Sequence, residues 1–209
     1  IPFIHFFDGF RTSHEIQKIE IPEYEYLKQM VDFKALENFR KRGLNPNHPV
    51  TRGTAQNDDV YFQNREACNI HYEKLGKIVC DYMKKINEKY GTSYKPFEYY
   101  GDKNAERIII AMGSVCETIE ETIDYLIKKG EKVGLIKVRM FRPFCSEYLI
   151  KEIPKSAKAI SVLDRTKEPG STNEPLYLDV LSSLKKFGLE SIKLYGGRYG
   201  LSSKNTEPN

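Results

Sequence analysis

The spacing of hydrophobic residues becomes regular near residue 105, and this change divides the chain into two parts. In the second part, short apolar runs alternate with stretches in which apolar residues recur every three or four positions. The runs predict four strands, at 107–112, 133–141, 157–163 and 191–195. The three- and four-residue spacing predicts helices at about 114–129, 146–153 and 176–187. Strands that alternate with helices through short connections are typical of a parallel sheet, so we expect a three-layer α/β domain over 105–195.

The best-marked helix start in this domain follows its first strand. Gly113 turns the chain, and Ser114 and Glu117 have the spacing of a capping box, in which each side chain bonds a backbone N–H of the other residue. Backbone N–H groups at a helix start also favour an anion, so Ser114 is a candidate ligand or domain-contact residue. The segment lacks the G-x-G-x-x-G spacing of a dinucleotide site, and an ordinary capped helix start is the other interpretation.

The first part of the chain is less regular. It predicts a helix at about 32–42, a loop at 44–49, a second helix at about 64–88 and a linker at 91–96. The chain opens with an apolar run at 1–9 that reads as a strand, and a free N-terminus seldom begins inside a buried strand. We therefore expect an excised piece of a larger protein.

Composition and charge exclude several classes of protein. The net charge is +4, from 33 basic and 29 acidic residues that are intermixed, so the clustered basic stripe of a nucleic-acid-binding protein is absent. The longest apolar run, around 108–115, is too short to span a membrane, and no signal peptide precedes it. We expect no nucleic acid and no membrane as partners.

The cysteines and histidines do not form a recognisable metal or catalytic motif. The four cysteines have no C-x-x-C pair, which zinc and iron–sulfur sites commonly use; they are Cys68, Cys80, Cys116 and Cys145. Such scattered residues are expected to remain reduced thiols in a cytoplasmic protein. We predict no catalytic residue and no metal ligand in this chain.

The loop after the third predicted strand, 164–170, carries four charges within five residues: Asp164, Arg165, Lys167 and Glu168. Ligands of open parallel sheets bind outside the carboxyl ends of the strands, where this loop begins. Arg165 and Lys167 are therefore candidates to bind a carboxylate or a phosphate. The same charges can instead pair with one another or with a neighbouring domain, and the sequence leaves both alternatives open.

A further candidate pair, Thr51 and Arg52, lies in the first part of the chain. They begin the polar stretch 51–56, in which an arginine among small residues can hold an anionic group. A structural turn explains this stretch equally well.

Seven blocks of sequence together resemble pyruvate:ferredoxin (flavodoxin) oxidoreductase. They stand in the family's order along nearly the whole chain: FFDGFRTSHE at 6–15, RGTAQN at 52–57, YFQNRE at 61–66, AMGSVCET at 111–118, LDRTKEPG at 163–170, EPLY at 174–177 and GGRYGL at 196–201. The resemblance implies four regions: the tail of an upstream thiamine-type domain at 1–65, a helix and linker at 66–104, a transketolase C-terminal-like domain at 105–195, and the start of a further domain or linker at 196–209.

The same resemblance implies an activity for the parent protein. Members of the family cleave pyruvate oxidatively with coenzyme A, giving acetyl-CoA, carbon dioxide and reduced ferredoxin or flavodoxin. They use thiamine diphosphate, magnesium and iron–sulfur clusters, and the parent is expected to be a homodimer. The family's cluster-binding cysteine motifs and its thiamine pyrophosphate and metal motif are absent from this chain. We therefore expect the chain to bind none of these cofactors, to shape the site from outside and to be inactive alone.

Two other functions fit the residues. The chain can be a free-standing α/β module that binds an anion or coenzyme A. It can also be a segment of another 2-oxoacid:ferredoxin oxidoreductase, because the sequence offers no substrate pocket that distinguishes the acids.

Overall fold

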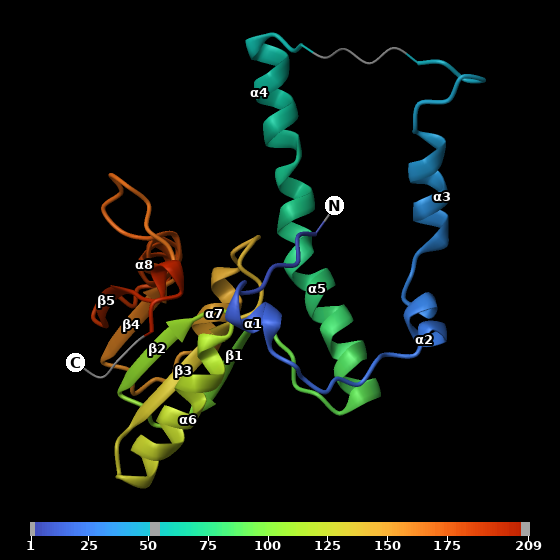
Figure 1. The fold of residues 1–209 in the computed structure, drawn as a ribbon. Helices are drawn as coiled ribbons and strands as arrows, with labels where there is room; N and C mark the ends of the chain where they lie inside the picture. The colour runs from blue at the N-terminus through green and yellow to red at the C-terminus, as the bar shows by residue number, and fades with distance from the viewer. Residues whose placement is uncertain (1–2, 51–54, 206–209) are drawn as a thin grey trace. The chain divides into compact units, whose positions relative to one another are not determined.

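The computed structural model describes residues 3–50 and 55–205, and the contacts within the chain separate two units. One unit is Ile16–Glu73, and the other combines Ile1–Glu15 with Lys74–Asn209. The second unit contains a five-stranded sheet (Figure 1).

The strands of the sheet are β1 (Phe97–Gly101), β2 (Arg107–Ala111), β3 (Val133–Val138), β4 (Ala159–Asp164) and β5 (Lys193–Arg198). Their order is β1-β3-β2-β4-β5. Strand β2 pairs in parallel with β3 and β4, and β4 pairs in parallel with β5. The predicted α/β fold with a parallel sheet is confirmed, and β1 adds one antiparallel strand beside β3.

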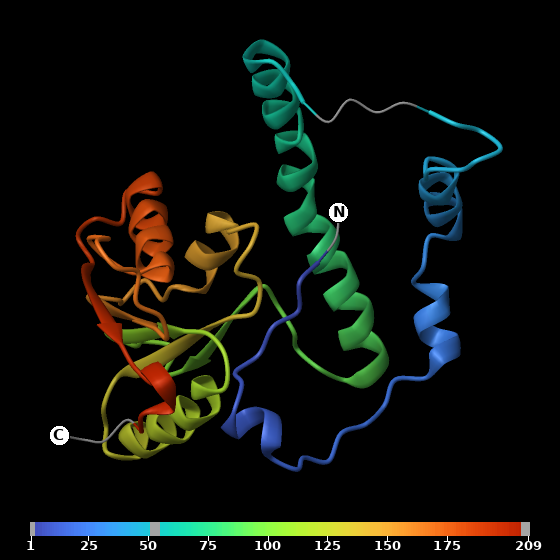
Figure 2. The same ribbon diagram turned by 45° about the horizontal axis from the view of Figure 1, so that its top comes forward.

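Helices cover both faces of this sheet (Figure 2). Helix α6 (Val115–Lys128) packs Ile119 and Ile123 on one face, against Leu135 of β3. Helices α7 (Ser146–Glu152) and α8 (Pro175–Lys186) pack on the other face. There, Leu149, Val180 and their neighbours enclose the apolar side chains of β2 and β4. The expected three layers are therefore present, with an apolar core on each side of the sheet.

Strand β1 follows the predicted linker at 91–96 and lies in the region 66–104, for which no strand is predicted. Phe97 is buried and anchors the strand, but Tyr99 and Tyr100 are both half-buried, so the alternation of inward and outward residues is weak. Pro96 directly precedes the strand, and a proline lowers the expectation of one. Gly101 ends it at φ +126, where an added Cβ would stand 2.7 Å from the Gly134 Cα, so the antiparallel approach to β3 requires glycine.

The order of the strands places a topological switch point between β2 and β4. From β2 the chain crosses through α6 to β3, on one side of β2, and from β3 it returns to β4 on the other side. The carboxyl ends of β2 and β4 therefore open the crevice in which open α/β sheets usually bind ligands. Gly113 and Ser114 follow the end of β2, and Arg165 follows the end of β4.

The unit Ile16–Glu73 is helical, as its sequence predicts in part. It contains α2 (Tyr24–Gln29), α3 (Phe33–Lys41), α4 (Asp58–Ala67) and the first turn of α5 (Asn69–Tyr90). Asp32 caps α3 by accepting a hydrogen bond from the Ala35 N–H at 2.9 Å. No residue of α2, α3 or α4 is buried. The helix predicted at 64–88 is two helices, α4 and α5, which meet at Cys68.

The ends of the chain differ from the sequence pattern in two places. The described residues 3–9 form no strand, and a short helix, α1 (Arg11–His14), follows them. At the other end, β5 continues through Gly196 and Gly197, beyond the predicted end of the strand at Tyr195. A short 3-10 turn, η1 (Leu201–Ser203), follows.

Candidate functional site

The carboxylate of Asp8 lies at the switch point, between the ends of β2 and β4. Its Oδ2 accepts hydrogen bonds from the backbone N–H of Ser114, at 2.7 Å, and from the Ser114 hydroxyl. Its Oδ1 lies 3.0 Å from a guanidinium nitrogen of Arg165. Ser114 and Arg165, which the sequence predicts as anion ligands, therefore both contact the carboxylate of Asp8. This carboxylate belongs to the same chain.

Gly113 makes this approach of Asp8 possible. Its φ is +86, a conformation that residues with a side chain rarely adopt. A Cβ at this position would lie 2.7 Å from Oδ2 of Asp8. Any side chain here would therefore displace the carboxylate as well as strain the turn.

The contacts of Asp8 favour its ionised form. Burial by itself raises the pKa of Asp8, but the hydrogen bonds from Ser114 and the charge of Arg165 outweigh burial and hold the pKa below its ordinary value. The positive end of the α6 dipole acts in the same direction. Asp8 is therefore a carboxylate anion at neutral pH when it contacts Ser114 and Arg165.

The predicted capping box at Ser114 and Glu117 is wrong, although a helix does start here. Ser114 has helical backbone angles and its side chain makes no cap hydrogen bond, so α6 begins at Val115. The hydroxyl donates to Asp8 instead. A capping serine accepts a hydrogen bond from a backbone N–H and has extended backbone angles, which Ser114 does not have.

Arg165 also contacts the C-terminal part of the chain. Its Nε donates to the carbonyl oxygen of Gly200 at 3.2 Å. Next to it, the Tyr199 hydroxyl donates to the Met112 carbonyl at the end of β2, at 3.5 Å. Burial, with a smaller effect from Asp8, raises the pKa of Tyr199 to about 12. Three distant segments therefore converge on the carboxyl edge of the sheet.

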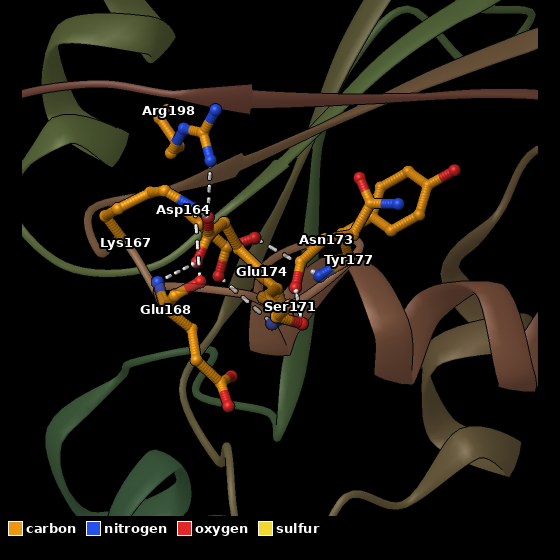
Figure 3. Close-up of polar contacts among 9 residues, drawn as sticks. Asp164, Lys167, Glu168, Ser171, Asn173, Glu174, Tyr177 and Arg198 are labelled. Carbon is orange, nitrogen blue, oxygen red and sulfur yellow. Dashed lines mark hydrogen bonds and ion pairs between the residues drawn. The ribbon is translucent and has the colours of Figure 1, made fainter.

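Lys167 does not join this cluster, although it lies only two residues after Arg165. Its Nζ lies 3.8 Å from the carboxylate of Glu174 and donates to the carbonyl oxygen of Glu168 (Figure 3). Glu174 also accepts hydrogen bonds from Arg198 at 2.7 Å and from the backbone N–H of Glu168 at 2.8 Å. Burial raises the pKa of Glu174, but these partners outweigh it and lower the pKa overall. Lys167 and the backbone of Glu168 therefore pair with Glu174, within the chain.

Asp164, the first residue of the charged loop, fastens the start of α8. It is buried, and its two oxygens accept hydrogen bonds from the backbone N–H groups of Leu176, at 3.0 Å, and Tyr177, at 3.2 Å. Burial raises its pKa, and the charges of Glu174 and Asp179 act in the same direction, against these two hydrogen bonds. A small polar pocket of about 110 Å³ opens beside it, lined by Asp164, Thr172, Asn173, Glu174, Tyr177, Gly196, Gly197 and Arg198.

The candidates Thr51 and Arg52 lie outside the described residues. Within residues 3–50 and 55–205, no group of three or more His, Cys, Asp or Glu side chains is arranged to hold a metal ion. Among the described helices, none combines the length and the apolar composition that crossing a bilayer requires.

Sequence reasoning misses three residues of these clusters: Asp8, Glu174 and Arg198. Only Glu174 carries a local signal, since it directly precedes Pro175 at the first turn of a helix, where acidic residues are favoured. Asp8 and Arg198 act through partners that are distant in the sequence.

The mostly parallel sheet, covered by helices on both faces, defines an open α/β domain whose ligand edge contacts an N-terminal segment of the same chain. Family models match both parts. Residues 1–84 match "Pyruvate flavodoxin/ferredoxin oxidoreductase, thiamine diP-bdg", and residues 105–204 match "Pyruvate:ferredoxin oxidoreductase core domain II". The chain belongs to the pyruvate:ferredoxin/flavodoxin oxidoreductase family, and the resemblance noted from the sequence blocks is confirmed.

Two curated relatives agree with this assignment. The chain is 56% identical over 209 residues to a pyruvate:ferredoxin oxidoreductase of Moorella thermoacetica, with all of the chain and 18% of that protein aligned. It is 50% identical over 212 residues to a pyruvate-flavodoxin oxidoreductase of a Nostoc species, with all of the chain and 51% of that sequence aligned. A solved 2-oxoglutarate:ferredoxin oxidoreductase of Magnetococcus marinus is 18% identical, with a TM-score of 0.34, over 52% of this chain and 17% of that one.

Proposed function

We propose that this chain is a docking and site-shaping part of an oxidoreductase that converts pyruvate and coenzyme A to acetyl-CoA and carbon dioxide. The observation that carries the proposal is the position of Asp8. An edge at which open α/β sheets usually bind a ligand holds a carboxylate from a segment that matches the thiamine-binding family model. The α/β domain therefore uses this edge to hold a neighbouring segment in place.

The parent reaction would transfer its electrons to ferredoxin or flavodoxin, in a homodimer that contains further domains. It would use thiamine diphosphate, magnesium and iron–sulfur clusters. The described residues do not form a donor set that fits a magnesium ion or an iron–sulfur cluster. The four free cysteines are consistent with a reducing, cytoplasmic compartment.

The isolated chain is expected not to turn over pyruvate, because its sequence lacks the family's cluster-binding cysteine motifs and its thiamine pyrophosphate and metal motif. The measurement is pyruvate-dependent reduction of a viologen dye by the purified chain with thiamine diphosphate, magnesium and coenzyme A. The matched positive control is the full-length Moorella relative. Dye reduction by the chain alone would contradict the docking role.

The rival function, an anion- or CoA-binding module, needs Arg165 and Lys167 to be available to a ligand. Arg165 is paired with Asp8, and Lys167 lies beside Glu174. We therefore expect calorimetry with coenzyme A to detect no tight binding to the wild-type chain. Tight binding that is lost in Arg165→Ala but kept in Lys185→Ala, a lysine at the far end of α8, would establish the rival instead.

A further inference from the structure

Two cysteines approach each other where α5 passes the start of α7. The sulfur of Cys145 lies 2.6 Å from the position that a Cβ on Gly76 would occupy, and the Tyr148 ring lies 3.3 Å from it. Gly76 is buried in the interior of α5, where a glycine costs roughly 0.5–1 kcal/mol relative to alanine. The close approach of the Cys145 sulfur explains why this helix has a glycine here.

Cys80 follows Gly76 by four residues, so both lie on the same face of α5. Side chains of an α-helix tilt toward its N-terminus, and the Cys80 side chain therefore leans back toward Gly76, above which the Cys145 sulfur lies. Four residues advance a helix by roughly 6 Å, so Cys80 lies one turn along α5 from the position that the Cys145 sulfur contacts.

The Tyr148 side chain bridges the two cysteines. Its ring contacts the Gly76 position that the Cys145 sulfur also touches, and the neighbouring Cys80 raises the pKa of the Tyr148 hydroxyl to about 12. Cys80 is also near enough to Cys145 for its charge to raise the pKa of Cys145. Both residues are half-buried, so small oxidants in the solvent reach them, whereas Cys116 of α6 is buried against the sheet.

We propose that Cys80 and Cys145 form an oxidisable pair that closes to a disulfide between α5 and the start of α7. With a peroxide as oxidant, the two thiols lose two electrons and two protons. One S–S bond forms, the O–O bond breaks, and the peroxide leaves as two molecules of water when it is hydrogen peroxide. A dithiol reductant reverses the step.

The disulfide would join two segments that the comparisons match separately. Cys80 lies within residues 1–84, which match the thiamine-binding family model, and Cys145 lies within residues 105–204, which match core domain II. Oxidation would therefore fix α5 against α7 covalently. This role is independent of the proposed docking function, since it needs neither Asp8 nor any catalytic activity.

Burial raises the pKa of Cys145, and the charges of Cys80 and Glu147 raise it further. The thiolate is the reactive form of cysteine, so closure is expected to be slow at neutral pH and to accelerate as the pH rises toward the pKa of the thiol. This dependence separates closure by a thiolate from nonspecific damage to the chain.

The test is peptide mapping of the purified chain after treatment with hydrogen peroxide, without reduction. The expected result is a dominant crosslinked peptide that joins Cys80 to Cys145, is lighter by two hydrogen atoms and separates on reduction. Cys80→Ser and Cys145→Ser should each abolish it, and Cys116→Ser should leave it intact. If Cys80 and Cys145 remain alkylatable, oxidise singly to sulfinic acids or pair chiefly with Cys68, the proposal is overturned.

Discussion

Replacing Ile110 with alanine is expected to lower the free energy of unfolding of the α/β unit by about 2–5 kcal/mol. Ile110 is fully buried in β2, with β3 and β4 on either side, where it pairs with Ile136 and Val162. The substitution removes three methyl or methylene carbons and leaves a cavity that a central strand cannot close. Urea denaturation followed by circular dichroism measures the loss as a lower midpoint.

Ile16→Ala is the matched control, because it makes the same chemical change at a fully exposed side chain. It is expected to change stability by no more than about 0.5 kcal/mol. Equal shifts for the two variants would mean that the sheet is not the cooperative core of this unit. A lower slope of the transition for Ile110→Ala, without a lower midpoint, would point instead to a change in the unfolded state.

The parallel strands could be predicted from the sequence because their signal is local. Ile108, Ile109 and Ile110 form a continuous apolar run, as expected for a strand that helices cover on both faces. The apolar face of α6, including Ile119 and Ile123, repeats at helical spacing. In each case the residues that define the element lie within one short window. Strand β1 has no such local sequence signal, because its stability depends on pairing with β3, more than thirty residues later.

The candidate site could be predicted only in part. Ser114 and Arg165 were identified because a parallel sheet brings the carboxyl ends of its strands to one edge. Their shared partner could not be identified, because Asp8 lies 106 residues before Ser114 and no local pattern marks it. For the same reason the sequence could not decide between ligand binding and pairing at the charged loop. In the structure Arg165 and Lys167 each lie beside an acidic partner within the chain, and this supports pairing as the proposal that calorimetry with coenzyme A tests.

Replacing Asp8 with asparagine is expected to release the N-terminal segment from the edge of the sheet while the sheet itself stays folded. Hydrogen bonds to a charged group contribute about 1.5–3 kcal/mol each, but solvent reaches part of this site, so we expect a local loss of about 1–2 kcal/mol. The measurement is hydrogen exchange of the Ser114 amide, whose N–H donates to Asp8. A loss of about 1.4 kcal/mol would accelerate this exchange about tenfold.

Asp81→Asn is the control for this variant, because Asp81 makes an exposed ion pair with Lys77 within one helix. Such exposed pairs contribute little to stability, and this pair is remote from the sheet edge, so the Ser114 amide should be unaffected. Unchanged exchange at Ser114 in Asp8→Asn would show that the carboxylate does not hold the segment. The docking function proposed for this edge would then lose its main support.

The same contact predicts a dependence on pH, and its direction follows from the pKa of Asp8. The folded pKa lies below the ordinary value of 3.8, so the stabilisation is fully present above that value and disappears as the pH falls through the folded pKa. The NMR shift of the Ser114 amide proton should therefore stay constant from neutral pH down to about 4 and change only below it. In Asp8→Asn this acid transition should be absent, because no carboxylate remains to take up the proton. A transition that persists in the variant would have to come from another group, and Asp8 would then not be the residue that joins the N-terminal segment to α6 and Arg165.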